Sequence, residues 1–165
     1  MFRRMPGGKR PKVAIASTQR ALRVPRKRIA ELIAFIARAE AAAIAEVDLA
    51  VVTAGEMAAL NRRYLRRSGC TDVLSFDLTG PGDAGLSAQI IVCGDVAVAE
   101  AARRGLRPQH ELMLYVIHGL LHLLGHDDGR TPDAAHMQSR QEELLAEFLR
   151  RPRRSRRAAK PKGRA

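Results

Sequence analysis

The stretch from His118 to Asp128, HGLLHLLGHDD, decides how the rest of the chain is interpreted. His118 and His122 stand four residues apart in an apolar run, so on a helix both imidazoles lie on one face, about one turn apart. Gly125 tolerates the left-handed conformation that ends a helix, and His126, Asp127 and Asp128 follow it. Two imidazoles at this spacing, with a third donor close behind, predict a metal site.

Two features limit this interpretation. A single histidine in an apolar helix is more commonly a hydrogen-bonded core residue, and that interpretation stays open for each ring taken alone. A zinc protease of the His-Glu-x-x-His type has a glutamate general base directly after its first histidine, and here that position is Gly119. The motif therefore argues against peptide hydrolysis.

Charge is divided sharply along the chain. The net charge is +12, yet residues 1–28 hold ten Lys and Arg with no acid, and residues 150–165 hold nine with no acid. Residues 29–149 carry 10 basic and 17 acidic side chains, a net of −7. Basic ends on an acidic body are typical of proteins that bind phosphate backbones without reading sequence, although such ends can also be merely solvated tails.

Hydrophobic periodicity predicts short strands alternating with helices. Strands are expected at 13–16, 47–52, 71–76 and 89–93, with a loop at 79–87. Helices are expected from Pro25, from Thr53 through Tyr64, after Val98 to about Arg104, from Pro108, and from Ala134 to about Arg150. The Pro108 helix is apolar nearly all round, which predicts a buried central helix. The fold class is α+β, a small four-stranded mixed sheet packed by about five helices.

We expect one domain, at 12–150. It lies between a basic extension at 1–11 and a basic tail at 151–165, and both of these ends are expected to be disordered. No apolar run approaches the roughly 18 residues of a membrane helix, so no membrane association is expected. Cys70 and Cys93 lack the close spacing of a Cys-x-x-Cys site or a disulfide scaffold, which suits a reducing compartment. The acid-free N-terminus also leaves an organellar transit peptide as an alternative.

A second motif, L-N-x-x-Y over 60–64 followed by T-D-V-L-S-F over 71–76, precedes G-D-V-A-V at 94–98. With H-G-x-x-H-L-x-G-x-D at 118–127, these segments resemble the YbeY family of bacterial rRNA maturation factors, which are metal-dependent endoribonucleases. The resemblance covers roughly residues 12–150. It implies one zinc ion per chain on His118, His122 and a third residue. The family has a third histidine where this chain has Asp128, an acceptable zinc ligand, and His126 is the alternative.

The resemblance implies a cytoplasmic endoribonuclease that cleaves single-stranded RNA with a metal-activated water. Its setting would be maturation of the 3′ end of small-subunit rRNA and ribosome quality control, with the small subunit as partner. His118 would be a catalytic residue. Many members place an arginine directly after the motif tyrosine, where this chain has Leu65, so Arg66 or Arg63 would have to serve.

Two other functions stay open. A non-catalytic RNA-binding ribosome-assembly factor could keep the same fold and the basic ends. A metal-dependent hydrolase of small molecules or peptides is disfavoured by Gly119 and by the polybasic ends. The oligomeric state does not follow from the sequence.

Overall fold

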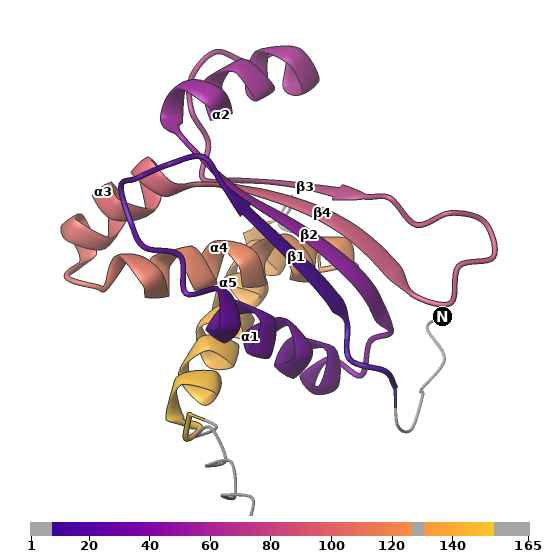
Figure 1. Cartoon of the computed structure of the whole chain (residues 1–165). Helices are drawn as coiled ribbons and strands as arrows, with labels where there is room; N and C mark the ends of the chain where they lie inside the picture. Colours follow the sequence, from indigo (N-terminus) through magenta and orange to yellow (C-terminus); the bar gives the residue numbers. More distant parts are fainter. Residues whose placement is uncertain (1–7, 127–130, 154–165) are drawn as a thin grey trace, which may run out of the picture.

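The computed structural model describes residues 8–126 and 131–153, and its regular structure lies between Lys12 and Arg150 (Figure 1). The elements, in chain order, are β1 (Lys12–Ser17), α1 (Arg26–Ala39), β2 (Ile44–Val52), α2 (Ala54–Leu60), the π-helical turn η1 (Asn61–Leu65), β3 (Val73–Asp77), β4 (Leu86–Cys93), α3 (Gly94–Arg104), α4 (Pro108–Leu123) and α5 (Thr131–Arg150). None of the described helices is long and apolar enough to cross a membrane.

The four strands form one mixed sheet in the order β1-β2-β4-β3. β1, β2 and β4 run parallel, and β3 pairs with β4 in the antiparallel sense. Parallel neighbours need a crossover connection, and α1 supplies the one between β1 and β2. The predicted α+β class, with a four-stranded mixed sheet and five helices, is confirmed.

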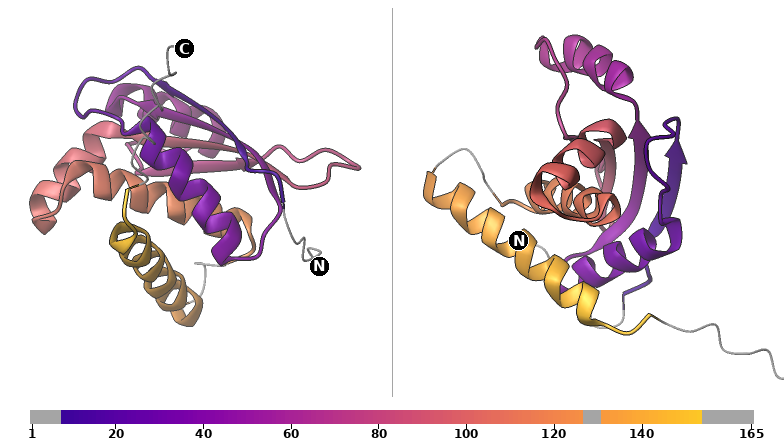
Figure 2. Two further views of the ribbon diagram at one scale, coloured as in Figure 1. Left: turned by 60° about the horizontal axis from the view of Figure 1, so that its bottom comes forward. Right: turned by 90° about the vertical axis from the view of Figure 1, so that its left-hand side faces the viewer.

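Helix α4 is the centre of the molecule. It lies against one face of the sheet, beside β3 and β4, with α5 packed across its outer side (Figure 2). Because it is covered on both sides, α4 is buried over Glu111–Ile117 and again over Gly119–Leu121. Its leucines and Ile117 join the side chains of α1, α5 and the strands in the main hydrophobic core, so the predicted buried central helix is confirmed.

A smaller core lies on the opposite face of the sheet. Five residues form it: Val52, Met57, Leu74, Ile91 and Cys93. Helix α2 covers this cluster, and Figure 1 shows α2 at one end of the sheet, apart from the other helices. The side chain of Thr53 accepts a hydrogen bond from the Glu56 backbone, and the Glu56 carboxylate accepts one from the Thr53 backbone, which confirms the predicted capping box.

The helix predicted from Thr53 through Tyr64 does not stay α-helical. It is α2 up to Leu60 and then widens into the π-helical turn η1, which ends at Arg66 in the left-handed conformation, with φ of 51°. The cause is Asn61, which is buried. Its carbonyl accepts a hydrogen bond from the Arg67 backbone, and its side-chain amide donates to the Gly69 carbonyl at 2.9 Å. These contacts reach beyond one helical turn, and helical periodicity does not reveal them.

Other boundaries differ by a few residues. The loop predicted at 79–87 ends earlier, because Leu86 already belongs to β4 and its backbone donates to the Ala43 carbonyl. Helix α5 begins at Thr131 rather than at Ala134. The disorder predicted for 1–11 and 151–165 falls mostly outside the described residues and stays a prediction.

Gly119 lies where α4 approaches the sheet closely. A β-carbon built there would lie 3.4 Å and 3.5 Å from side-chain carbons of Ile90 and 3.5 Å from Cβ of Ser75. These are ordinary contacts for a methyl group, but they leave no room for a larger side chain. The position that carries glutamate in the His-Glu-x-x-His proteases therefore faces the sheet in this chain.

We predict that Gly119→Ala leaves the free energy of unfolding unchanged or raises it by up to about 1 kcal/mol, because the methyl group fits and alanine favours helix. Gly119→Leu should lower it by about 1–3 kcal/mol, because the side chain would push α4 away from β4. Urea unfolding of the two variants measures the difference. Equal stabilities for both variants would contradict the close approach.

Candidate functional site

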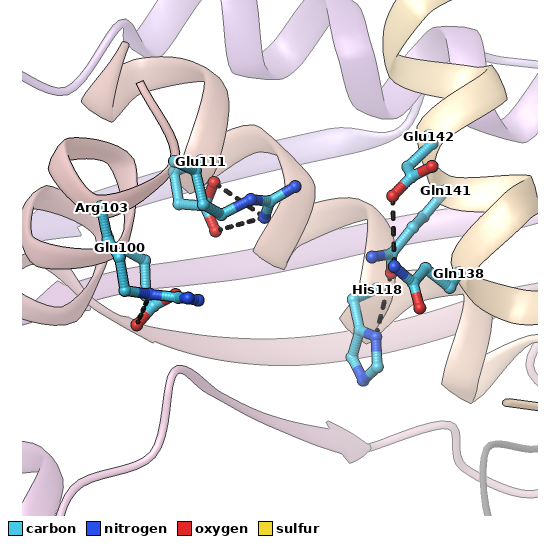
Figure 3. A network of polar contacts seen from close by, with 8 residues as sticks. Glu100, Arg103, Glu111, His118, Gln138, Gln141 and Glu142 are labelled. Carbon is cyan, nitrogen blue, oxygen red and sulfur yellow. Dashed lines mark hydrogen bonds and ion pairs between the residues drawn. The ribbon is translucent and has the colours of Figure 1, made fainter. Parts of the chain in front are cut away.

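A pocket of about 340 Å³ opens beside α4, where α3, the start of β3 and α5 meet. Its lining is Asp72, Val96, Glu100, Arg104, Glu111, Leu114, Tyr115, His118 and Gln141. Figure 3 shows Glu111 and His118 of α4, with Gln141 of α5 pointing at the histidine. The pocket therefore combines one of the predicted metal ligands with polar side chains from three further segments.

Helical spacing places the α4 residues in this pocket. Glu111, Leu114, Tyr115 and His118 are separated by three or four residues, so they form one stripe along the helix, and His122 continues it by one more turn. In the described structure, Glu111, Leu114, Tyr115 and His118 are the residues of α4 that line the pocket. The apolar helix therefore presents a polar line to the pocket.

Glu111 is a charged residue in the interior, only 2% exposed, and Arg104 compensates it. One guanidinium nitrogen of Arg104 lies 3.1 Å and 3.2 Å from the two carboxylate oxygens of Glu111. The pair joins the end of α3 to the start of α4. A buried carboxylate needs such a partner, because removing one member of the pair would leave an uncompensated charge.

Tyr115 lies one turn after Glu111 on α4 and lines the same pocket. Burial raises the pKa of its phenol well above the usual value, and the charges of Glu111 and Asp72 raise it further. The hydroxyl therefore keeps its proton over the whole neutral range, and its hydrogen bond to Glu111 contributes to the same rise in pKa.

His118 is held by α5. Its Nδ1 lies 3.1 Å from Oε1 of Gln141. An amide oxygen is an acceptor, so Nδ1 carries a proton and donates in this contact. Partners of this kind orient metal-binding histidines and fix their tautomer. The same contact also satisfies a plain structural histidine, and the tautomer alone does not distinguish the two roles.

The other predicted ligands lie at the end of α4. His122 is in its last turn, and the chain then turns at Gly125, whose φ is +99°, as the motif predicts. Asp128, the predicted third ligand, lies outside the described residues, as does Asp127. Among the residues the structure describes, no three His, Cys, Asp or Glu side chains gather as a metal group.

His126, the alternative third ligand, is engaged elsewhere. Its Nε2 lies 3.2 Å from one carboxylate oxygen of Glu40, and Nε of Arg140 lies 2.7 Å from the other. The ring also stacks on His136, with centroids 6.4 Å apart. Glu40 therefore links the segment after α4 to both α1 and α5, and His126 does not join His118 and His122 in the described structure.

The remaining donors fit a divalent ion such as zinc. His118 and His122 are on consecutive turns of one helix, and the sharp turn at Gly125 follows just beyond them. Imidazole nitrogens with a carboxylate oxygen are a donor set that zinc accepts. The described residues supply two of these donors, and Asp128, the third ligand that the sequence predicts, lies outside them.

Arg63 and Arg66, the predicted catalytic arginines, are exposed. The ring of Tyr64 packs on Phe76 at 5.6 Å, and Phe76 alternates with Ser75, which faces α4. Tyr64 therefore lies on the side of the sheet opposite α4. Within the described structure, no residue of η1 lines the His118 pocket, whose arginine is Arg104.

Sequence reasoning missed Arg104, Glu111 and Gln141. A signal for Glu111 was present, because it is an acid seven residues before His118 in an apolar helix and so shares its face. Arg104 and Gln141 gave no such signal, since only the packing of α3 and α5 against α4 brings them to the site.

Comparison with known proteins gives one consistent result. Residues 14–149 match the family model described as Endoribonuclease YbeY. A protein named Endoribonuclease YbeY from Anaeromyxobacter dehalogenans is 36% identical over 152 residues, which cover 88% of this chain and 77% of that protein. One of the same name from Chromohalobacter salexigens is 40% identical over 105 residues, covering 62% of this chain and 68% of that protein.

A solved structure has the same fold. The solution structure of a Thermotoga maritima protein superposes with a TM-score of 0.56 and covers 83% of this chain and 89% of that one. The two sequences are 23% identical, so this likeness bears on the fold alone.

Proposed function

The chain belongs to the YbeY family, and on that premise we propose that it is a metal-dependent endoribonuclease that cleaves single-stranded RNA. The relatives it matches are named endoribonucleases. The observation that carries the proposal is the pocket of about 340 Å³ beside α4. His118 lines this pocket, and its Nδ1 lies 3.1 Å from Oε1 of Gln141. A pocket of this volume lies at the lower end of the range of small-ligand sites.

His118, His122 and Asp128 would hold the ion, which we propose to be one zinc per chain. When bound, zinc supplies Lewis acidity, which polarises a phosphate oxygen and lowers the pKa of a bound water. Gln141 keeps the His118 ring in the tautomer and orientation that binding requires. Tyr115 keeps its proton, so it adds no negative charge to the pocket where the phosphate would lie.

Positive charge is needed where the scissile phosphate gains charge in the transition state. Arg63 and Arg66 are the source that we propose from the family resemblance, although η1 lies on the face of the sheet opposite the α4 pocket, so the RNA strand itself would have to extend past Asp72 to meet them. Both side chains are exposed and long enough to move onto a bound strand. Arg104 is already committed to Glu111, so it contributes less net charge to the pocket.

The cellular process that we propose is taken from the family resemblance. We propose action in the cytoplasm on the 3′ end of small-subunit rRNA, with the small subunit as partner and ribosome quality control as the wider role. The basic ends would hold the RNA backbone without reading its sequence. The competing proposal is an RNA-binding assembly factor without catalysis, which the replacement of the family's third histidine by Asp128 favours.

Elemental analysis of tag-free protein tests the metal site. We expect about one zinc per chain, absent from both His118→Ala and Asp128→Ala, and cleavage of single-stranded RNA should disappear with it. Retention of zinc in Asp128→Ala together with its absence from His126→Ala would identify His126 as the third ligand.

Arg63→Ala and Arg66→Ala serve as matched variants, because they should keep the zinc and still cleave more slowly, by about 100-fold for the one that contacts the phosphate. An unmodified protein that binds the same RNA but never cleaves it, with or without added zinc, would favour the assembly factor.

Gln141→Ala should weaken zinc binding or activity by about 10–100-fold, because the His118 ring would no longer have the partner that orients it. Gln138→Ala is the control, since Gln138 is exposed on the same helix and bonds to Glu142 at 3.3 Å (Figure 3). Competition with a chromophoric chelator measures zinc affinity directly. Equal affinities in the two variants would show that Gln141 only packs.

Removal of the basic ends should flatten the salt dependence of RNA binding. Deletion of 1–11 and 152–165 keeps Arg151, whose guanidinium lies 4.5 Å over the Phe35 ring and belongs to the fold. The slope of log K against log salt should fall in magnitude by about 0.7 for each RNA phosphate that the ends had neutralised. Fluorescence anisotropy with a labelled single-stranded RNA provides the slopes, and an unchanged slope would show that the ends do not bind RNA.

A further inference from the structure

The two cysteines of the chain meet in space although 23 residues separate them in sequence. Their Sγ atoms lie 3.4 Å apart, and both are free thiols. Cys70 belongs to the irregular segment between η1 and β3, and Cys93 is the last residue of β4. Their sequence spacing predicts no pairing, so the contact comes from the fold alone.

The two thiols differ in exposure. Cys93 is completely buried in the smaller core under α2, where it packs with Met57 and Leu74. Cys70 is exposed, and its segment has no strand or helix to hold it in place. A bond between the sulfurs needs an approach to about 2.05 Å, and the irregular backbone around Cys70 can make that movement.

We propose that Cys70 and Cys93 are a thiol pair that a hydroperoxide oxidises to a reversible disulfide. In the first step the Cys70 thiolate attacks a peroxide oxygen, the O–O bond breaks, and the alcohol or water leaves with a proton, which gives a sulfenic acid. The Cys93 sulfur then attacks the Cys70 sulfur. Water leaves with the Cys93 proton, and the two sulfurs have together given two electrons to the peroxide.

The surroundings of Cys70 set the speed of this reaction. Although Cys70 is exposed as a residue, its sulfur lies against Cys93 and partly out of water, and this desolvation raises the pKa of Cys70 to about 12. Cys93 and the carboxylates of Asp95 and Asp72 add to the shift. The thiolate is the reactive form, and below the pKa its fraction grows about tenfold with each pH unit. The pair is therefore slow to oxidise at neutral pH and responds to sustained rather than brief exposure to peroxide.

A disulfide at this place would fix the segment that carries Arg66 and Arg67. That segment is already held on both sides of Cys70, because Asn61 bonds to Gly69 and Thr71, and the Asp72 carbonyl accepts a hydrogen bond from the Cys93 backbone at 2.9 Å. The cross-link would tie its middle to the end of β4 and the start of α3. Oxidation would thus add a covalent link to hydrogen bonds that can open, and so keep the arginine-bearing segment at the end of β4, while the α4 pocket lies on the other face of the sheet.

The test uses the full-length protein, reduced and then exposed to hydrogen peroxide. We expect a monomer lighter by two hydrogen atoms, a linked Cys70–Cys93 peptide, and return to the starting mass with dithiothreitol. Formation should be about 100-fold faster at pH 9 than at pH 7. The oxidised form should melt about 5–10 °C higher, and amide exchange over 66–72 should slow at least about tenfold.

Cys70→Ser is the first control, because Cys70 is exposed and its replacement leaves the core intact. Its melting temperature should not respond to peroxide, which separates the disulfide from methionine oxidation. In Cys93→Ala, peroxide should drive Cys70 to the sulfinic acid. Sulfinic acid at Cys70 with no cross-link in the unmodified protein, or a dimer linked through two copies of Cys70, would overturn the proposal.

Discussion

Helix α4 is pressed between the sheet and α5, and this double burial governs the rest of the structure. A helix covered on two sides has to be apolar on both, and α4 is buried over most of its length. Only the line of residues that faces the pocket, between the sheet and α5, can carry polar groups without disturbing the core. Glu111, Tyr115 and His118 occupy that line, and the pocket forms along it. The hydrophobic core and the pocket are therefore both built on α4, from different faces of the helix.

Glu111 and His118 each depend on a neighbouring helix. Arg104 of α3 compensates the buried Glu111, and Gln141 of α5 holds the His118 ring. A charged or hydrogen-bonding group in the interior costs free energy unless its partner is present with good geometry. The two helices beside α4 thus do more than bury apolar surface, because they complete the polar groups of the site.

Residues whose role is local were predictable from sequence. The capping box at Thr53, the turn at Gly125 and the apolar α4 all appear where the pattern places them, since each depends on neighbours within one or two turns. The π-helical turn escaped prediction because Asn61 bonds to a segment several residues away. The pairing of Cys70 with Cys93 escaped it because it joins distant elements. Asp128 stays a prediction, since it lies outside the described residues.

The ring contact between Phe35 and Phe148, with centroids 5.7 Å apart, joins the first helix of the chain to the last. Arg28 also packs on the ring of Phe148, at 4.0 Å from its centroid. During synthesis α1 leaves the ribosome long before α5, so the apolar surface that Phe148 covers stays open until the final helix has emerged. A chain cut short before α5 would expose this surface. The final helix thus decides whether a nascent chain closes its core or presents apolar surface to chaperones and proteases.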